Sequence, residues 1–484
     1  MGSIRGWLRN LLFGFPHGLA RLGLLDRKKG SEAFDLAVPA MVTGGMRTVL
    51  RAADFFMVSI ALGHEAVAAL ELGFQYYFIP FGLALALTSG TISVVSRFKG
   101  AGRDAAADLA VKQSLWLSLL LAIPITAATW VYAEPMIDVL TDDPLTISLG
   151  ATYLRIVMLS VTFRFWSMVA ARALAGSGDT RTPMYIRFLT LPTNVVLNAV
   201  LIFGLLGFPA LGVAGAAWGT VAANTLSGVL FFVALLTGRF DVSLRPGGKQ
   251  WDTGIVTEIV RVGLPLAGTR LSRTFGRFPF LFVLGVLGTE VVAAYAIGRR
   301  VMLMALMPAW GYSTAASTLV GQSIGAGNDE EATGYGWQTL RIALVTQLLI
   351  AAGIFVAARP IAATFDTENV ALTVSFIRLF GVSVAGFSVA RTMRGGLRGA
   401  GDTRWPLYGG LLGTYVVRLP IAALALPVGF VVTLGPLSVA PGLGWGLAAV
   451  YLAILGDIYT RAVVNVVRFR SGKWQAVGRP ATAD

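Results

Sequence analysis

The chain of 484 residues contains two copies of one long sequence pattern. The motif GSGDTRTP at residues 176–183 returns as GAGDTRWP at 399–406, which is 223 positions later. Three shorter pairs repeat at spacings of 225 or 226 positions: LGHEAVAA with LGTEVVAA, GAG with GAG, and LAVP with VGLP. Solenoid repeats are about 20–50 residues long, so this period indicates instead a duplicated bundle of the kind found in membranes.

Hydropathy predicts the environment of this bundle. Hydrophobic residues make up 55% of the chain, charged residues only 13%, and the mean hydropathy is +0.71. Soluble domains carry about 25% charged residues. Apolar runs of about 20 residues, enough to cross a bilayer, recur along this whole chain. We therefore expect an all-α polytopic membrane protein with twelve transmembrane helices. They are expected at 36–61, 66–96, 106–132, 146–174, 183–206, 212–237, 256–286, 291–322, 334–358, 370–395, 405–430 and 440–468.

The loops between these helices predict the topology. Segments on the N-terminal side are basic, as at Lys28 and Lys99, whereas those on the other side hold acids such as Glu134 and Glu290. Lys and Arg favour the cytoplasmic side, so both termini are expected there. Six crossings per half predict two six-helix lobes related by a pseudo-two-fold axis along the membrane normal. The expected parts are a basic amphipathic arm (1–35), an N-lobe (36–237), a cytoplasmic linker (238–255), a C-lobe (256–468) and a cytoplasmic tail (469–484).

Composition also argues against several function classes. The net charge of +14 would favour nucleic acid only on a soluble domain, and none is expected. Cysteine is absent, which excludes disulfides. The only histidines are His17 in the arm and His64 in an outer loop, and no Gly-rich phosphate loop is present. We expect no enzyme, no cofactor and no metal site beyond a sodium position.

The repeated motif also has a plain structural interpretation. Its glycines suit a left-handed helix end, its Asp or Thr suits the cap of the next helix, and its Pro suits a first helical turn. The motif nevertheless resembles the cytoplasmic loops after helices 4 and 10 of the multidrug and toxic compound extrusion (MATE) transporters. The segments 194–204, 212–220 and 315–327 are similar to helices 5, 6 and 8 of that family. The resemblance spans about residues 30–475 and implies two six-helix lobes in a V that export organic solutes in exchange for protons or sodium.

Acidic residues at membrane depth are the candidates for cation coupling, because each is costly there. Asp54 follows Pro39 by fifteen residues, at the position where the resemblance places the coupling aspartate of the family. We expect Pro39 to act as a hinge in this helix. The alternative is a fixed ion pair between Asp54 and Arg51, three residues earlier on the same face. Glu71 lies near the outer end of its helix and suits a position in water. Asp457 is expected to pair with Arg461.

The fifth helix departs from the family pattern. Many members have an aspartate four residues after the asparagine, where this chain has Asn198 after Asn194. Asparagine offers an oxygen to sodium but takes up no proton. Thr220 and a carbonyl near Ala216 complete a weak oxygen cage around Asp54, and interhelical hydrogen bonding is the alternative role for both asparagines. We therefore favour proton over sodium coupling.

Arginines at membrane depth point to the substrate. Arg270, Arg273 and Arg277 are expected on one face of a helix, and Arg47 and Arg51 occupy the matching depth of the first copy. Each costs about 2.5–3.5 kcal/mol in a bilayer centre unless it meets water, a carboxylate or an anionic ligand. With Glu71 and Gln75, these residues are candidate cavity or charge partners. They also favour an anionic or zwitterionic substrate, as in lipid-linked oligosaccharide flippases of the same superfamily.

The sequence thus predicts a cation-coupled antiporter of the MATE type in the cell membrane. It is expected to export small organic, amphipathic compounds by alternating access, as a monomer surrounded by membrane lipids and without nucleic acid. The alternative is a flippase for a lipid-linked oligosaccharide or an anionic lipid. A membrane enzyme or a channel fits less well, because neither an acid cluster nor a continuous polar stripe is present.

Overall fold

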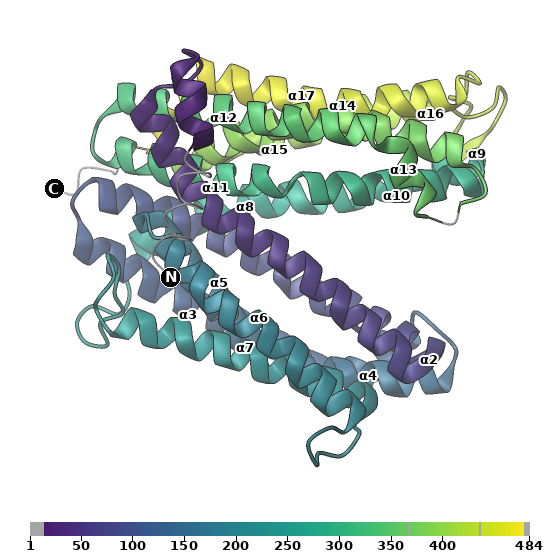
Figure 1. The fold of residues 1–484 in the computed structure, drawn as a ribbon, viewed down its shortest axis with the longest axis horizontal. Helices are drawn as coiled ribbons and strands as arrows, with labels where there is room; N and C mark the ends of the chain where they lie inside the picture. The colour runs from purple at the N-terminus through teal and green to yellow at the C-terminus, as the bar shows by residue number, and fades with distance from the viewer. Residues whose placement is uncertain (1–13, 366, 435–436, 479–484) are drawn as a thin grey trace. The chain divides into compact units, whose positions relative to one another are not determined.

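The computed structural model describes residues 14–365, 367–434 and 437–478, without the side chains of 51–55, 58, 61–68, 78–79, 432–434 and 437. Residues 14–21 are helical. The first group of elements in Figure 1 is α2 (Arg27–Gly100), α3 (Asp104–Asp138), α4 (Pro144–Met158), α5 (Val161–Ser177), α6 (Arg181–Phe203), α7 (Gly212–Leu236) and α8 (Thr253–Phe275). The second group is α9 (Arg277–Leu287), α10 (Thr289–Ala305), α11 (Met307–Gly325), α12 (Asp329–Val356), α13 (Ala358–Ala363), α14 (Val370–Gly399), α15 (Arg404–Leu411), the π-helix η1 (Leu412–Arg418), α16 (Leu419–Ala423), α17 (Gly446–Arg470) and α18 (Gln475–Gly478).

Over the described residues, the fold is all-α apart from one short hairpin. Strands β1 (Val432–Leu434) and β2 (Leu437–Val439) pair antiparallel, with Thr433 opposite Ser438. Among the described residues, seven helices are long and apolar enough to cross a membrane. Two bent pairs, α4 with α5 at 48° and α10 with α11 at 45°, raise that number to nine. These bends fall inside the expected helices 146–174 and 291–322.

The expected helices 36–61 and 66–96 both lie within the single element α2. Arg47 and Tyr77 of α2 both act on the charge of Arg187, although a straight helix would place these two residues about 45 Å apart. The chain therefore turns back between them, and each expected helix accounts for part of α2. Within α2, Ala69–Gly100 qualifies as a span by length and composition.

Two other predicted helices are interrupted. The expected helix 256–286 breaks at Gly276, so Arg277 begins α9 instead of continuing the face of Arg270 and Arg273. The expected helix 405–430 is divided into α15, η1 and α16 and already ends at Ala423. Pro427 follows that end, and proline cannot continue the hydrogen-bond ladder of a helix.

The chain forms two compact units, and each contains a helical segment from the other half of the sequence. The N-terminal unit is Pro39–Leu264, and the C-terminal unit is Met1–Val38 with Pro265–Asp484. Both boundaries lie at equivalent prolines inside α2 and α8. In each case the proline carbonyl accepts from a threonine hydroxyl one turn later, Thr43 at 2.8 Å and Thr269 at 2.9 Å. The same device therefore marks both points where the chain passes from one unit to the other.

Side-chain contacts hold each exchanged segment in its unit. In the C-terminal unit, Ala33 packs with Leu319 and Phe469, and the hydroxyl of Tyr335 donates to the carboxylate of Glu32. In the N-terminal unit, Ile259 is fully buried in one core cluster. There Glu258 also accepts from Arg97 at 2.9 Å. The first turns of α2 and α8 are thus parts of the two cores.

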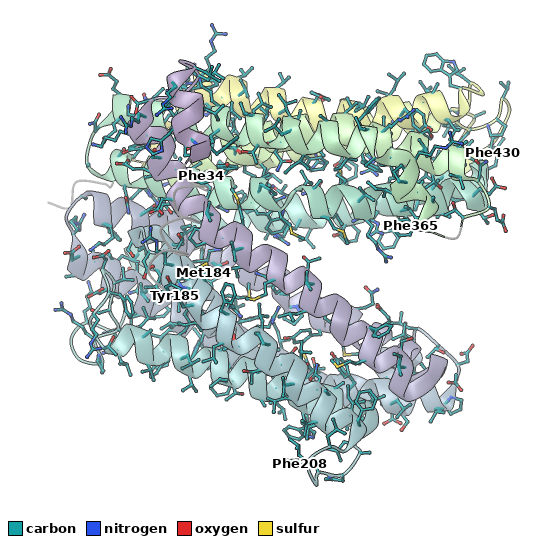
Figure 2. The ribbon with its side chains drawn as sticks, viewed as in Figure 1. Phe34, Met184, Tyr185, Phe208, Phe365 and Phe430 are labelled. Atoms are coloured by element: carbon teal, nitrogen blue, oxygen red, sulfur yellow. The ribbon has the colours of Figure 1, made fainter. Side chains whose placement is uncertain are left out.

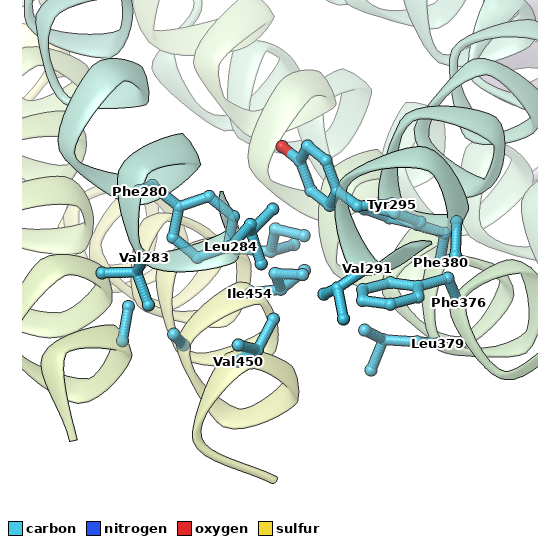
Figure 3. Packing of buried hydrophobic residues seen from close by; sticks show 14 of the residues in the cluster. Phe280, Val283, Leu284, Val291, Tyr295, Phe376, Leu379, Phe380, Val450 and Ile454 are labelled. Carbon is cyan, nitrogen blue, oxygen red and sulfur yellow. The ribbon is translucent and has the colours of Figure 1, made fainter. Parts of the chain in front are cut away.

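The main core of the C-terminal unit consists of aromatic and branched side chains from several helices. Figure 3 shows Phe280 and Leu284 of α9 beside Tyr295 of α10 and Phe376 of α14. Figure 1 shows α10, α14 and α17 running side by side in this unit. Aromatic residues also occur in the loops: Phe430 follows α16 in this unit, and Phe208 follows α6 in the N-terminal unit (Figure 2). The long helices of this unit are therefore joined by direct side-chain packing.

The repeated motif has the turn geometry predicted from its sequence in the first copy. Gly178 ends α5 with φ at 108°, and the Asp179 side chain accepts from the backbone N–H groups of Arg181 and Thr182. In the second copy Gly401 has φ at 80°, but the Asp402 side chain instead accepts from Arg468 at 2.6 Å. The glycine role is repeated, and the role of the aspartate is not.

Candidate functional site

Three of the predicted cation-coupling residues lie on α6 and α7, which pack against each other. Asn198 is buried on α6 with its amide against Gly219, where a methyl group would overlap the amide oxygen. The neighbouring Thr220 donates to the carbonyl of Ala216 at 2.9 Å within α7. Asn194 is half-buried one turn before Asn198. Asparagine and threonine side chains therefore lie on two packed helices, and the cation cage formed by their oxygens stays a prediction.

Two residues of the predicted site lie outside the described side chains. Asp54 and Arg51 belong to α2, and their side chains are not described. The role of Asp54 and the alternative ion pair with Arg51 therefore stay predictions. Pro39 is buried at the boundary between the two units, which is the place that a hinge in this helix would need.

The remaining predicted residues of α2 are exposed. Glu71, Gln75 and Arg47 all have exposed side chains. Arg47 lies close enough to Arg187 for the two positive charges to repel each other. Arg164 acts on Arg187 in the same way, so three arginines lie near one another in this unit.

A polar network beside these arginines was not anticipated from the sequence. Asn224 of α7 donates to Tyr77 at 3.2 Å and to Ser160 at 3.0 Å, and its oxygen accepts from Arg164 at 3.3 Å. The Arg164 guanidinium also lies over the rings of Tyr77 and Phe81. The sequence gives only a weak indication of this network, because its members are single polar residues in different helices that come into contact only when the helices pack.

The C-terminal unit contains a pocket lined mainly by arginines. Arg273 of α8, Arg391 and Arg394 of α14, and Arg461 of α17 line it together. Thr269, Pro406 and Asn465 are among its other walls. Arg394, Arg461 and Arg270 all repel the charge of Arg273, and Arg391 lies 3.8 Å from the centre of the Trp310 ring. Of this group, Arg270 and Arg273 were predicted from the sequence as cavity residues and Arg461 as the partner of Asp457, whereas Arg391 and Arg394 were not named.

One carboxylate at the same depth is already neutralised. Asp457 is 6% exposed and accepts from Arg461 of its own helix at 2.6 Å, as its sequence spacing predicted. Arg418, at the end of η1, lies 3.8 Å from the other carboxylate oxygen. Gly413 of the same π-helix faces Asp457 so closely that a methyl group there would lie 2.5 Å from the carboxylate. π-Helices often occur at functional sites, and here the irregularity brings η1 against a buried charge.

Chemically, this arrangement suits binding of charged solutes better than catalysis. Among the described residues, no group of three or more His, Cys, Asp or Glu side chains could hold a metal ion. Asparagine, threonine and guanidinium groups recognise ions by hydrogen bonding, and none of them is a general base near neutral pH. The described side chains of the two units thus include neutral oxygen groups on α6 and α7 and a group of arginines around one pocket.

Comparison with known proteins agrees with the duplication and with the helical fold. The family model described as MatE matches residues 39–200 and again 265–424. The chain is 28% identical over 456 residues, 92% of itself and 93% of the relative, to a probable multidrug resistance protein NorM of Thermotoga maritima. It is 26% identical to a FAD transporter of Shewanella oneidensis, over 72% of this chain and 77% of that protein.

Solved structures support the same fold. One is described as the outward-facing conformation of a multidrug resistance MATE family transporter of the MOP superfamily. It aligns with a TM-score of 0.81 at 23% identity and covers 93% of this chain and 96% of that chain. The two-lobe, twelve-helix layout of such transporters accommodates the two matched segments of the family model. The chain is therefore a multi-pass membrane protein that belongs to the MatE family of transporters.

Proposed function

We propose that this protein exports small organic, amphipathic compounds across the cell membrane in exchange for a cation, with the proton as the coupling ion. The observation that carries the proposal is the double match to the MatE model over both halves of the chain. The multidrug resistance relative, similar over nearly its whole length, supports the class of cargo. The basic cytoplasmic loops support cytoplasmic termini.

Asp54 is the residue that we propose to couple the cation. A carboxylate at membrane depth changes charge when a proton binds, whereas Asn194 and Asn198 do not titrate. A sodium ion would need several oxygen ligands, and the pair of asparagines supplies neutral ones only. Proton coupling therefore needs Asp54 alone, and sodium coupling needs Asn198 and Thr220 as well.

The proposed cycle uses the hinge at Pro39. A proton arriving from outside neutralises Asp54, helix α2 repacks around this proline, and the substrate leaves to the exterior. Loss of the proton to the cytoplasm restores the inward-facing form. The boundary between the compact units at Val38 and Pro39 supports a hinge there, because neighbouring residues on either side pack in different units.

Transport by vesicles tests this cycle. Ethidium efflux is measured in proteoliposomes with a pH gradient or a sodium gradient imposed separately. Asp54→Asn is expected to lose gradient-driven efflux, whereas Asp54→Glu keeps a titrating group and is expected to retain part of it. Normal gradient-driven efflux by the Asp54→Asn variant contradicts the proposal. If efflux by the wild type responds to the sodium gradient but not to the pH gradient, sodium is the coupling ion.

A second candidate function is flipping of an anionic or lipid-linked substrate. The observation that favours it is the number of arginines that line the pocket of the C-terminal unit. The relative that is named a FAD transporter supports anionic cargo as well, since FAD carries a diphosphate. Failure of ethidium efflux together with flipping of a fluorescent anionic lipid would favour this second function.

A further inference from the structure

We propose that the pocket between α8, α14 and α17 binds a phosphate group of an anionic substrate. The proposal rests on the transport function above and specifies the class of its cargo. The pocket lies wholly within the C-terminal unit, and four of its walls are guanidinium groups, from Arg273, Arg391, Arg394 and Arg461. Guanidinium groups match phosphate oxygens in geometry and charge, and they bind them by paired hydrogen bonds.

The charge balance of the pocket favours an anion. Asp457 is the nearest carboxylate, and it is already shared by Arg461 and Arg418. Among the described residues, no carboxylate lies within ion-pair distance of Arg273, Arg391 or Arg394. Their charges repel one another across the pocket. Arg391 and Arg394 are half-buried and Arg273 is exposed, and an anionic group bound between these arginines would relieve their mutual repulsion.

The size of the pocket points to a head group. Its free volume is about 30 Å³, whereas sites that enclose a drug-sized ligand measure about 300–1,000 Å³. A phosphate is compact and can lie among the guanidinium groups while the rest of the molecule stays outside. Apolar neighbours are available for that remainder, because Phe387 and Ile458 line the same pocket and Trp310 stacks on Arg391.

A matched pair of fluorescent probes isolates the phosphate. Binding of 4-methylumbelliferyl phosphate and of 4-methylumbelliferone is measured by calorimetry on the full chain in nanodiscs. We expect the phosphate ester to bind at least about tenfold more tightly and to weaken as salt is raised, since hydrogen bonds to charged groups contribute about 10- to 100-fold in affinity. Equal affinity of the two probes for the wild type overturns the proposal.

Variants on a single helix provide the control. Arg391→Gln and Arg394→Gln are expected to weaken binding of the phosphate ester about 10- to 100-fold and to change binding of 4-methylumbelliferone less than twofold. Arg378→Gln is the matched control, because Arg378 is an exposed arginine of α14 that lies over Phe355 and does not line the pocket. A loss of affinity in Arg378→Gln as large as in Arg394→Gln overturns the assignment. Size-exclusion profiles confirm folding, and the salt dependence of the wild type tests the site without any variant.

Two further arms separate the sources of the phosphate and the two proposals. Competition by dioctanoyl phosphatidic acid at lower concentration than by adenosine monophosphate identifies a lipid head group. The reverse order identifies a soluble phosphate, and either order supports an anion site. Absence of competition by both overturns it. Efflux of ethidium by the same protein tests the transport function separately, so intact efflux without phosphate binding rejects the anion site alone.

Discussion

The two units come from one duplicated sequence, and yet they use their charged residues differently. The last helix of the N-terminal half, α7, contains no charged residue, whereas α17 in the second half carries Asp457, Arg461, Arg468 and Arg470. Two of these arginines form ion pairs, Arg468 with Asp402 and Arg461 with Asp457. The two copies thus share the glycine turn of the repeated motif, while different charges give equivalent positions different partners.

The carboxylates at membrane depth show the same contrast. In the second copy Asp457 has two arginine neighbours and serves a structural role. In the first copy Asp54 is the predicted coupling residue. The comparison therefore predicts that one unit responds to the cation gradient and that the other binds the anionic part of the cargo.

Removal of the Asp457 carboxylate is expected to have the largest effect on stability. Asp457→Ala leaves Arg461 and Arg418 without their shared partner, and breaking a buried ion pair costs about 3–5 kcal/mol. A fall in the unfolding temperature in detergent measures the loss. Efflux by the Asp457→Asn variant is measured as well. If this efflux still responds to the imposed cation gradient, the result supports the division of roles between the units. If the variant is as stable as the wild type but its efflux no longer responds to the gradient, the result contradicts that division.

The two aspartates of the repeated motif are expected to differ in cost. Asp402→Ala leaves Arg468 buried without a carboxylate and should lose about 3 kcal/mol. Asp179→Ala removes only a helix cap, worth about 1 kcal/mol. Thermal unfolding of the two variants checks the ranking, and equal losses would show that both copies use the motif in the same way.

The glycines that end α2 and α11 are expected to give equal effects. Gly102 and Gly327 have φ values of 67° and 75°, with nothing within 4 Å of an added methyl group. The cost of Gly102→Ala or Gly327→Ala is therefore conformational only, about 1–2 kcal/mol. Unequal shifts in unfolding temperature would mean that the backbone of the two copies has diverged as well.

The smallest expected effect is a pH dependence confined to the N-terminal unit. The hydrogen bond from Lys249, followed by the backbone N–H of Ile255, lowers the pKa of Asp252 at the start of α8. A lowered folded pKa means that this stabilisation is present above the unfolded pKa, near 3.9, and is lost as the pH falls below it through the folded value. Exposed pairs contribute about 0.2–1 kcal/mol. In the Asp252→Asn variant, the unfolding temperature should depend less on pH in this acid range. If its dependence on pH is the same as in the wild type, other carboxylates cause that dependence.

Local features were predictable from the sequence, and convergent ones were not. The left-handed Gly178 and the cap by Asp179 follow from neighbouring residues, and so does the pair of Asp457 with Arg461 four positions later. The pocket joins Arg273 to arginines more than a hundred positions away, and only tertiary packing brings them together. Arg391 and Arg394, three positions apart within an apolar run, were a signal that the prediction did not use.

The helix breaks show the limits of hydropathy in the same way. An average over 20 residues detects an apolar segment and is insensitive to a single Gly276, so it joined α8 and α9.

The exchange of α2 and α8 at Pro39 and Pro265 has a consequence for the biosynthesis of the protein. Translation completes the first half before Thr253–Leu264 exists, so the nascent N-terminal unit is missing the segment that carries Glu258 and Ile259. Residues 27–38, in turn, are synthesised before the rest of the C-terminal unit in which they pack. Each compact unit is therefore complete only when the whole polypeptide is present.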